Sequence, residues 1–347
     1  MFLEQIGADA RVRETFRSHA TTGTELGRVS FASHEQYRVW FETGEGEAAP
    51  SGKLRWQDAL PATGDWVVAR RVDPELALIE AVLPRRTQFS RRAAGKAVAE
   101  QVIAANIDLA VVVCGLDRDF NLRRIERYLV LARESGAEPV IVLNKADLSG
   151  SVAEDIAEVT RIAGGAQVVA LSAHESVEPL AGMVQGRTVA FLGSSGVGKS
   201  TIANGLLGEH RQATGAVRAS DSRGRHTTTS RMLLPLPGGG ALIDNPGMRE
   251  LQLWASEETL AETFEDIAAF AERCRFADCA HDDEPGCGVR EALAEGTLDE
   301  ARWQSYRKLQ REVRYQALQE DVHARQAQKQ RWKAIHKALR HHPKYRR

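Results

Sequence analysis

The chain has 347 residues, of which 43% are hydrophobic and 27% charged, a composition typical of a globular protein long enough for two or three domains. Its longest apolar run, Leu109–Leu116, is far shorter than a membrane span, and Met1–Ala20 has no apolar stretch of signal-peptide length. We therefore expect neither membrane insertion nor export, and a cytoplasmic location.

The formal net charge of −1 conceals a basic end of the chain. Ala324–Arg347 holds nine Lys or Arg residues and no Asp or Glu, so the remainder of the chain is acidic overall. This asymmetry predicts a localised contact with a polyanion rather than a generally basic surface.

Residues from about 25 to 83 are expected to form short strands. Tyr37–Phe41 alternates between apolar and polar residues, Gly64–Ala69 follows a Pro/Gly turn, and Leu76–Val82 is a third strand candidate. This spacing predicts a small β-barrel, and an OB-like barrel is the first choice because it is a common nucleic-acid module. A β-domain that only braces its neighbour is the alternative. The connector Pro84–Ala99 is basic, with no acid, which suits either solubility or RNA contact.

From Gln101 the pattern changes to alternating strands and helices, which predicts an α/β sheet with its ligand at the carboxyl ends of the strands. Asn121 is expected to cap the first helix and Gly136 to end it. The predicted strands are Ile107–Val113, Pro139–Leu143, Val168–Leu171, Arg187–Leu192, Arg231–Leu236 and Ala241–Ile243. Further helices are expected over Val152–Ala163 and from about Lys199.

Two segments have the chemistry of a guanine-binding site. Asn144-Lys145-Ala146-Asp147 follows a predicted strand, and its Asp147 carboxylate would accept from N1–H and the exocyclic amine of guanine, a pairing that adenine cannot reciprocate. Lys145 would pack its stem along the base. Ser172 and Ala173 end the next strand and resemble the backbone motif that contacts guanine O6. Together these segments favour GTP over ATP.

Gly193–Ser200 matches the full phosphate-loop pattern, with a strand before it and a helix after it. Its glycines let backbone N–H groups surround the β-phosphate, Lys199 would reach the β- and γ-phosphates, and Ser200 would ligate Mg²⁺. The loop follows the base-reading motif by about fifty residues, whereas in an ordinary Ras-like GTPase it comes first. The order predicts a circularly permuted G domain with separate domains on either side.

The metal and γ-phosphate sensor comes last. Asp244 ends a strand, which suits a carboxylate linked to Mg²⁺ through water, and the Gly247 N–H can sense the γ-phosphate. Between phosphate loop and sensor lies a switch-loop candidate, Asp221–Ser230, in which one of three adjacent threonines is expected to complete the Mg²⁺ shell, with Thr228 as the candidate.

One residue departs from the Ras-like mechanism. Met248 stands where those enzymes have a water-positioning Gln, so unaided hydrolysis is expected to be slow. His226 is the candidate catalytic substitute, with a partner completing the site; an RNA or surface contact is its alternative role. The residues expected to bind GTP are Asn144, Lys145, Ala146, Asp147, Ser172, Ala173, Gly193, Ser194, Ser195, Gly196, Val197, Gly198, Lys199, Ser200, Thr201, Asp244 and Gly247.

After Pro246 the chain is expected to be helical, with Ser256 capping a helix and a long charged helix from about Asp299 to Gln319. Between them stands Cys274-x4-Cys279-x-His281-x5-Cys287, three thiolates and an imidazole that form a closed tetrahedral set for one structural Zn²⁺. Free thiols are the alternative, and nearby arginines are candidates for RNA contact. The predicted domains are 1–90, an OB-like barrel; 91–253, the permuted GTPase domain; 254–323, a helical zinc-binding domain; and 324–347, the basic tail.

With these motifs in place, the chain resembles the ribosome small subunit-dependent GTPase A family of bacteria. The resemblance rests on Gly64–Val67, Glu100–Asn106, Gly193–Thr201, Gly224–Thr229 and Cys274–Cys287. It implies an N-terminal OB barrel, a circularly permuted G domain, a zinc domain, late maturation of the small ribosomal subunit and GTPase activity stimulated by that subunit. Asn245, where the family more often has a small hydroxyl residue, departs from the pattern.

The expected partners are the small ribosomal subunit with its rRNA and GTP/GDP, for a monomeric chain that does not contact a membrane. One competing hypothesis is an rRNA-binding assembly chaperone in which the nucleotide is mainly structural. Another is a different permuted GTPase class that serves the large subunit, which the barrel and the cysteine cluster disfavour.

Overall fold

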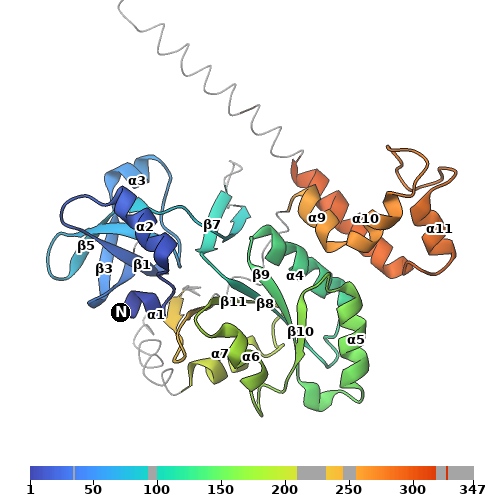
Figure 1. Ribbon diagram of the computed structural model, residues 1–347, viewed down its shortest axis with the longest axis horizontal. Coiled ribbons are helices and arrows are strands. Elements are labelled where there is room, and N and C mark those ends of the chain that lie inside the picture. The colour runs from blue at the N-terminus through green and yellow to red at the C-terminus, as the bar shows by residue number, and fades with distance from the viewer. Residues whose placement is uncertain (34–35, 93–99, 209–231, 245–254, 318–325, 327–347) are drawn as a thin grey trace, which may run out of the picture.

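The structure is a computed structural model that describes residues 1–33, 36–92, 100–208, 232–244, 255–317 and 326. A β-barrel, a central α/β sheet and a group of C-terminal helices follow one another along the chain, with the sheet between the other two (Figure 1). Within these ranges no helix has the length and apolarity needed to cross a membrane. The fold class predicted from the sequence is confirmed.

The N-terminal part is a closed five-stranded barrel. Two short helices, α1 (Phe2–Gln5) and α2 (Ala10–His19), precede it, and α3 (Gly52–Trp56) lies between its third and fourth strands. The strands pair in the order β1-β2-β3-β5-β4, and β4 returns to pair with β1. All these pairs are antiparallel except β3 with β5. The strands are β1 (Thr24–Ala32), β2 (Tyr37–Phe41), β3 (Gly44–Pro50), β4 (Trp66–Arg71) and β5 (Leu76–Val82).

A hairpin of β6 (Gln88–Arg92) and β7 (Glu100–Ala105) follows the barrel. The sequence predicts a basic connector over Pro84–Ala99, but the first strand of this hairpin lies in that segment. Phe89 in β6 and Ile103 in β7 are almost fully buried in the core of the central sheet, which explains why this segment is a strand. The basic residues concealed this short period-two pattern from sequence analysis.

The central sheet has the strand order β10-β9-β8-β11-β13-β12, with β12 alone antiparallel. The chain builds β8, β9 and β10 in one direction and then returns to place β11 on the other side of β8. The strands are β8 (Leu109–Gly115), β9 (Glu138–Asn144), β10 (Gln167–Ala170), β11 (Thr188–Leu192), β12 (Met232–Pro235) and β13 (Ala241–Asp244). In a sheet of this kind the ligand binds at the carboxyl ends of the strands beside the point of reversal, here between β8 and β11.

Four helices cover the two faces of this sheet: α4 (Leu122–Glu134), α5 (Val152–Ile162), α6 (Glu178–Val184) and α7 (Lys199–Leu207). Every residue of β8 is buried, and alternate residues belong to different cores: Val112 packs on one face and Val111 on the other. Burial on both faces explains the uninterrupted apolar run in the sequence. The Asn121 side chain accepts a hydrogen bond from the Arg124 N–H, which confirms the predicted cap of α4.

The barrel joins the central sheet through a buried guanidinium. Arg28 on β1 is 1% exposed and stacks over the Trp66 ring, 4.8 Å from its centroid. It donates to the carbonyls of Ile6, Gly64 (3.3 Å) and Asn106 (3.0 Å) and to the hydroxyl of Thr188 (2.8 Å), the first residue of β11. Burial lowers the pKa of Arg28 to about 10, so the group stays protonated at neutral pH.

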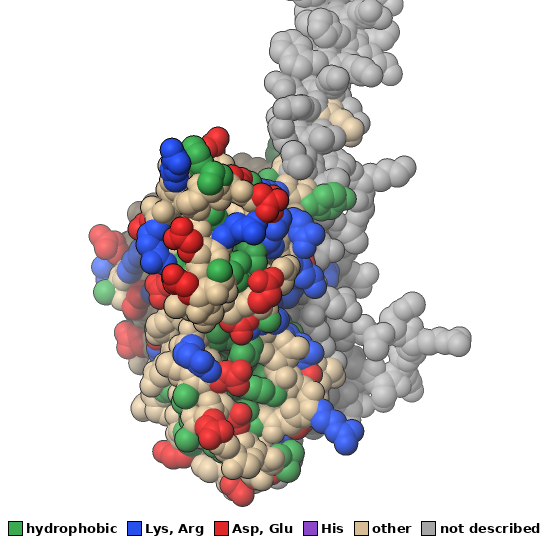
Figure 2. All heavy atoms as spheres, turned by 90° about the vertical axis from the view of Figure 1, so that its right-hand side faces the viewer, with side chains coloured by type: hydrophobic (Ala, Val, Ile, Leu, Met, Phe, Trp, Pro, Cys, Tyr) green, Lys and Arg blue, Asp and Glu red, His purple; other side chains and the backbone are tan. Residues whose placement is uncertain are grey.

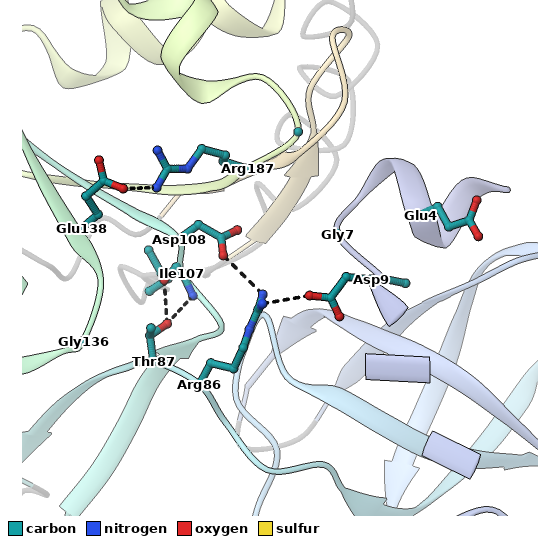
Figure 3. A pocket seen from close by; sticks show the side chains of 12 residues that line it. Glu4, Gly7, Asp9, Arg86, Thr87, Ile107, Asp108, Gly136, Glu138 and Arg187 are labelled. Carbon is teal, nitrogen blue, oxygen red and sulfur yellow. Dashed lines mark hydrogen bonds and ion pairs between the residues drawn. The ribbon is translucent and has the colours of Figure 1, made fainter. Parts of the chain in front are cut away.

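Two further contacts hold the barrel against the sheet. β1 pairs with β12 at Phe31 and Met232, so barrel and central sheet share one continuous set of strands. Arg86 forms ion pairs with Asp9 at 3.0 Å and with Asp108 at 3.3 Å across a hollow of about 660 Å³ (Figure 3). This hollow lies at the amino ends of β8 and β11, opposite the carboxyl ends where a ligand is expected.

The C-terminal helices pack on α4. They are α9 (Glu257–Thr263), α10 (Glu265–Ala271), α11 (Gly288–Ala294) and a helix over 300–317. Arg302 connects them to α4: it contacts the fully buried Glu126 at 2.9 Å and Asp266 of α10 at 2.6 Å. Burial raises the pKa of Glu126. Because a buried carboxylate without a partner is costly, this pair ties the C-terminal helices to one position on α4.

We predict that Arg28→Met lowers the free energy of unfolding by about 2–5 kcal/mol, because the buried carbonyls of Ile6 and Asn106 lose their donor. Arg38→Met is the matched control: Arg38 lies on the neighbouring strand, is 32% exposed and pairs with Glu45 at 3.7 Å. Its loss should cost less than about 1 kcal/mol. Urea denaturation followed by circular dichroism measures both; equal losses would contradict a special role for Arg28.

Candidate nucleotide site and metal centre

The phosphate-loop candidate connects the carboxyl end of β11 to the amino end of α7. Gly193 and Gly198 have φ angles of 142° and 99°, which side chains rarely adopt. A Cβ on Gly193 would overlap the carbonyl oxygen of Val113, and one on Gly198 would overlap the Asn144 amide. Val197 is 1% exposed and anchors the loop in the core. The spacing of the two glycines therefore has a steric cause.

Lys199 lies at the start of α7, where its ammonium group is held over the loop. Its Nζ donates to the carbonyl of Gly193 at 2.6 Å and to that of Ser194 at 2.5 Å. Ser200 and Thr201 follow in the first turn of the helix. Backbone N–H groups at a helix amino end together with an ammonium group make a site for an anion such as a phosphate.

Asn144 connects three of the predicted motifs. Its side chain is 3% exposed; the amide Nδ2 donates to the carbonyl of Val197 at 2.8 Å, and Oδ1 accepts from the Ala173 N–H at 3.0 Å. The base-reading motif, the phosphate loop and the end of β10 are thereby fixed to one another. Segments about fifty residues apart in the sequence meet at one edge of the sheet, at the carboxyl ends of β9, β10 and β11.

Lys145 and Asp147 follow Asn144 and lie nearer the surface than its buried side chain. Lys145 has a φ of 62°, and its Nζ forms an ion pair with Asp117 at 2.6 Å. This hydrogen bond is the main reason that the pKa of Asp117 is lowered. Ala146 donates its N–H to the carbonyl of Leu171 at 3.2 Å, and Asp147 is exposed in the short turn η1 (Ala146–Leu148). The Asp147 side chain is thus accessible from outside the protein, in a turn held against the segment that contains Ser172 and Ala173.

Sequence analysis missed two side chains of this site. Asp117 positions Lys145, and Arg124 on α4 donates to the Ser194 hydroxyl at 2.8 Å while it pairs with Asp119. Asp117 and Asp119 come soon after β8. Charged residues at the carboxyl end of a buried strand often belong to a binding site, and this signal would have indicated both residues. The Arg124 contact spans seventy residues and has no local signal.

The remaining nucleotide and magnesium candidates are only partly described. Asp244 ends β13, which is parallel to β11, so it lies at the same edge of the sheet as the phosphate loop. Gly247, Thr228 and His226 lie outside the described residues, as do Asn245 and Met248.

The four metal-ligand candidates lie together. The ligand atoms of Cys274, Cys279, His281 and Cys287 are all within 4.8 Å of one another. The Sγ atoms of Cys274 and Cys287 are 3.9 Å apart, and His281 Nδ1 lies 3.5 Å and 3.4 Å from them. A tetrahedron with Zn–S of about 2.3 Å and Zn–N of about 2.0 Å has edges of about 3.8 Å and 3.5 Å. The cluster therefore fits one tetrahedral metal ion.

The chain around the cluster has the backbone conformations that bring the ligands together. His281 has a φ of 61°, and Gly286, directly before Cys287, has a φ of 72°. Cys287 is 3% exposed and directly precedes α11, and the His281 ring lies edge-on to Trp303, with the ring centroids 5.8 Å apart. Burial lowers the pKa of His281, which favours the neutral imidazole that a metal requires.

Comparison with known proteins gives consistent results. The model of the RsgA GTPase family matches residues 82–254, and that of the ABC transporter family matches residues 181–341, a range that includes the phosphate loop common to both classes. Among solved structures, YjeQ from Thermotoga maritima superposes with a TM-score of 0.63 at 28% identity, over 84% of this chain and 98% of that one. YloQ, titled a circularly permuted GTPase, has a TM-score of 0.62 at 24% identity, over 86% and 98%.

Full-length relatives are more similar in sequence. The small ribosomal subunit biogenesis GTPase RsgA of Opitutus terrae is 49% identical, over 98% of this chain and 97% of its own. The protein of the same name from Syntrophotalea carbinolica is 44% identical over 96% of both chains. With this identity along nearly its whole length, and with the permuted sheet and cysteine cluster described above, the chain belongs to the RsgA GTPase family.

Proposed function

We propose that this protein binds the small ribosomal subunit and acts in its late maturation, hydrolysing GTP to GDP and phosphate with stimulation by the subunit. The observation that carries the proposal is the position of Asn144, which holds the phosphate loop and the base-reading segment together in a permuted chain. The names of the full-length relatives support the subunit as partner.

In the proposed site, the triphosphate binds the Gly193–Thr201 loop and Lys199, while guanine lies against Asn144–Asp147 and Ser172–Ala173. Asp147 gives the preference for guanine, because its carboxylate pairs with two donors that adenine lacks. Asp117 supports this by holding Lys145 in place through the 2.6 Å ion pair.

We assign Mg²⁺ to Ser200, Asp244 and Thr228, with Gly247 sensing the γ-phosphate. A Mg²⁺ ion at this position would neutralise charge that develops on the phosphate oxygens. Met248 cannot orient a water, so His226 is the proposed catalytic residue, and docking on the subunit completes the site. Because the site is complete only on the subunit, GTP hydrolysis is slow in the free protein and fast in the docked one.

We assign one Zn²⁺ to the cysteine–histidine cluster, in a structural role. Four protein ligands fill a tetrahedral shell, so no coordination position remains for a substrate.

The proposed zinc domain, 254–323, follows the barrel of 1–90 and the G domain of 91–253 and precedes the basic tail of 324–347. The protein is proposed to act as a cytoplasmic monomer.

The rival function is an rRNA chaperone in which the nucleotide is mainly structural. We expect multiple-turnover GTP hydrolysis to rise at least about tenfold when purified small subunits are added, because Met248 leaves the free enzyme without its water-positioning group. Phosphate release measured with small subunits, large subunits and neither tests this. Saturable GTP binding without stimulation by small subunits would favour the chaperone.

We predict that Asp147→Asn shifts the nucleotide preference from guanine toward xanthine, because the amide can donate to the xanthine O2 where the carboxylate accepted from the guanine amine. The dissociation constant for GTP divided by that for XTP should therefore rise by about tenfold or more. Asp155→Asn, on the neighbouring helix α5, is the matched control and should leave the ratio unchanged. A variant at position 147 with the wild-type ratio would contradict the assigned base contact.

We predict that the purified protein holds about one zinc per chain and that Cys287→Ser loses it, because the thiolate is one of four ligands. Elemental analysis measures the zinc, and the thermal midpoint should fall together with its loss. Cys114→Ser, at a buried thiol on β8 outside the cluster, is the control and should keep the metal. Zinc retained at full stoichiometry in Cys287→Ser would contradict the ligand assignment.

A further inference from the structure

The helix α3 of the barrel presents an exposed tryptophan. Trp56 is 89% exposed, more than any other large apolar side chain in the described part of the protein. Apart from Leu54, all residues from Gly52 to Leu60 are exposed, so the ring stands on an open surface. In Figure 1 this helix lies at the end of the barrel away from the central sheet. An exposed apolar residue alone indicates no function, but an indole this exposed leaves both faces of its ring open to contact another molecule.

The backbone under Trp56 is well fixed. The Ser51 hydroxyl caps the helix by accepting from the Leu54 N–H at 3.4 Å, and Leu54 is 5% exposed in the barrel core. The turn that follows is closed by the Ala59 N–H donating to the Leu54 carbonyl at 3.0 Å. Trp56 therefore occupies a defined place, as a binding residue needs.

The charge around the ring is positive. Lys53 and Arg55 are exposed in the same short helix, which contains no acid; Asp58 follows in the next turn. Leu60, 42% exposed, follows Trp56 along the chain, and two further exposed apolar residues of the barrel, Val72 and Leu76, flank a turn that contains Asp73 and Glu75. A polyanion would thus be attracted to α3 and repelled from that turn.

The exposed aromatic residue near the cysteine–histidine cluster is a weaker candidate for binding a polyanion than Trp56. Phe276 is 42% exposed beside Arg275, yet acids lie close by, and Arg290 is paired with Asp283 at 2.5 Å. Figure 2 shows the face on this side of the molecule, where blue and red side chains are interspersed. Mixed charge of this kind does not select a nucleic acid.

We propose that Trp56 stacks on an unpaired base of the small-subunit RNA, with Lys53 and Arg55 contacting the adjoining phosphates. The inference rests on the proposed function, since it takes the small subunit as partner. An indole accepts any base on its face, and basic neighbours supply the contact to the backbone, which is the combination typical of single-stranded RNA recognition. The alternative is that Trp56 packs against a ribosomal protein. Lys53 and Arg55, which lie beside Trp56 in the chain, favour RNA over a protein.

The first experiment measures the dissociation constant of the full-length protein for purified small subunits, with a non-hydrolysable GTP analogue present. Trp56→Ala should weaken binding by about tenfold or more, whereas Trp56→Phe, which keeps an aromatic face, should lose much less. Val72→Ala, at an exposed apolar position beside the acidic turn of the barrel, is the matched control and should bind as the wild type does. Unchanged binding of Trp56→Ala would overturn the inference.

The second experiment separates RNA from protein. A photo-crosslinking phenylalanine analogue placed at position 56 should form an adduct with small subunits. Ribonuclease should reduce this adduct to the protein carrying a short RNA fragment, and protease should leave a peptide attached to nucleotide. An adduct with ribosomal protein alone would overturn the inference while leaving the proposed function intact. Failure of the wild-type chain to bind small subunits at all would instead overturn the proposed function, and this inference with it.

Discussion

The guanidinium of Arg28 is the contact on which the arrangement of the first two domains depends. It is a positive charge in the interior that donates four hydrogen bonds, to carbonyl and hydroxyl oxygens from four separate segments. One of these segments begins β11, the strand that leads into the phosphate loop, so the barrel is fixed to the element that positions Lys199. Around it, Gly64 has a φ of 91° and approaches the backbone of Ala105 too closely for any Cβ. A lysine could not reproduce this planar set of contacts.

The helix α4 has an equivalent role toward the C-terminal helices. Arg124 donates to Ser194 of the phosphate loop, while Glu126 and Arg127 pair with Arg302 and Glu312 of the helix over 300–317. By contrast, the pair between Arg314 and Glu257 is more than 60% exposed on both sides and contributes little. The buried pair, and not the number of surface pairs, fixes where the cysteine–histidine cluster lies relative to the phosphate loop.

The features that could be predicted from the sequence are those whose cause lies within a few neighbouring residues. The phosphate loop, the caps at Asn121 and Ser256, and the cysteine spacing all follow from requirements that act over a few residues, and the structure places each as expected. Arg28, whose partner Thr188 is 160 residues away, has no such signal and looks like any polar residue on a strand. The β6–β7 hairpin was missed for the related reason that its apolar residues are few and its partner core is remote.

The pairing of β1 with β12 has a consequence for solubility. A central sheet of this kind would end at β12 with a row of unpaired N–H and C=O groups, the template on which chains join into aggregates. The barrel covers that border, and its own strands close on themselves, so β10 is the one edge left among the described strands of the sheet. β10 has only four residues, Gln167–Ala170, too short to recruit another chain firmly. The N-terminal barrel thus lies against the edge of the central sheet that β12 would otherwise expose.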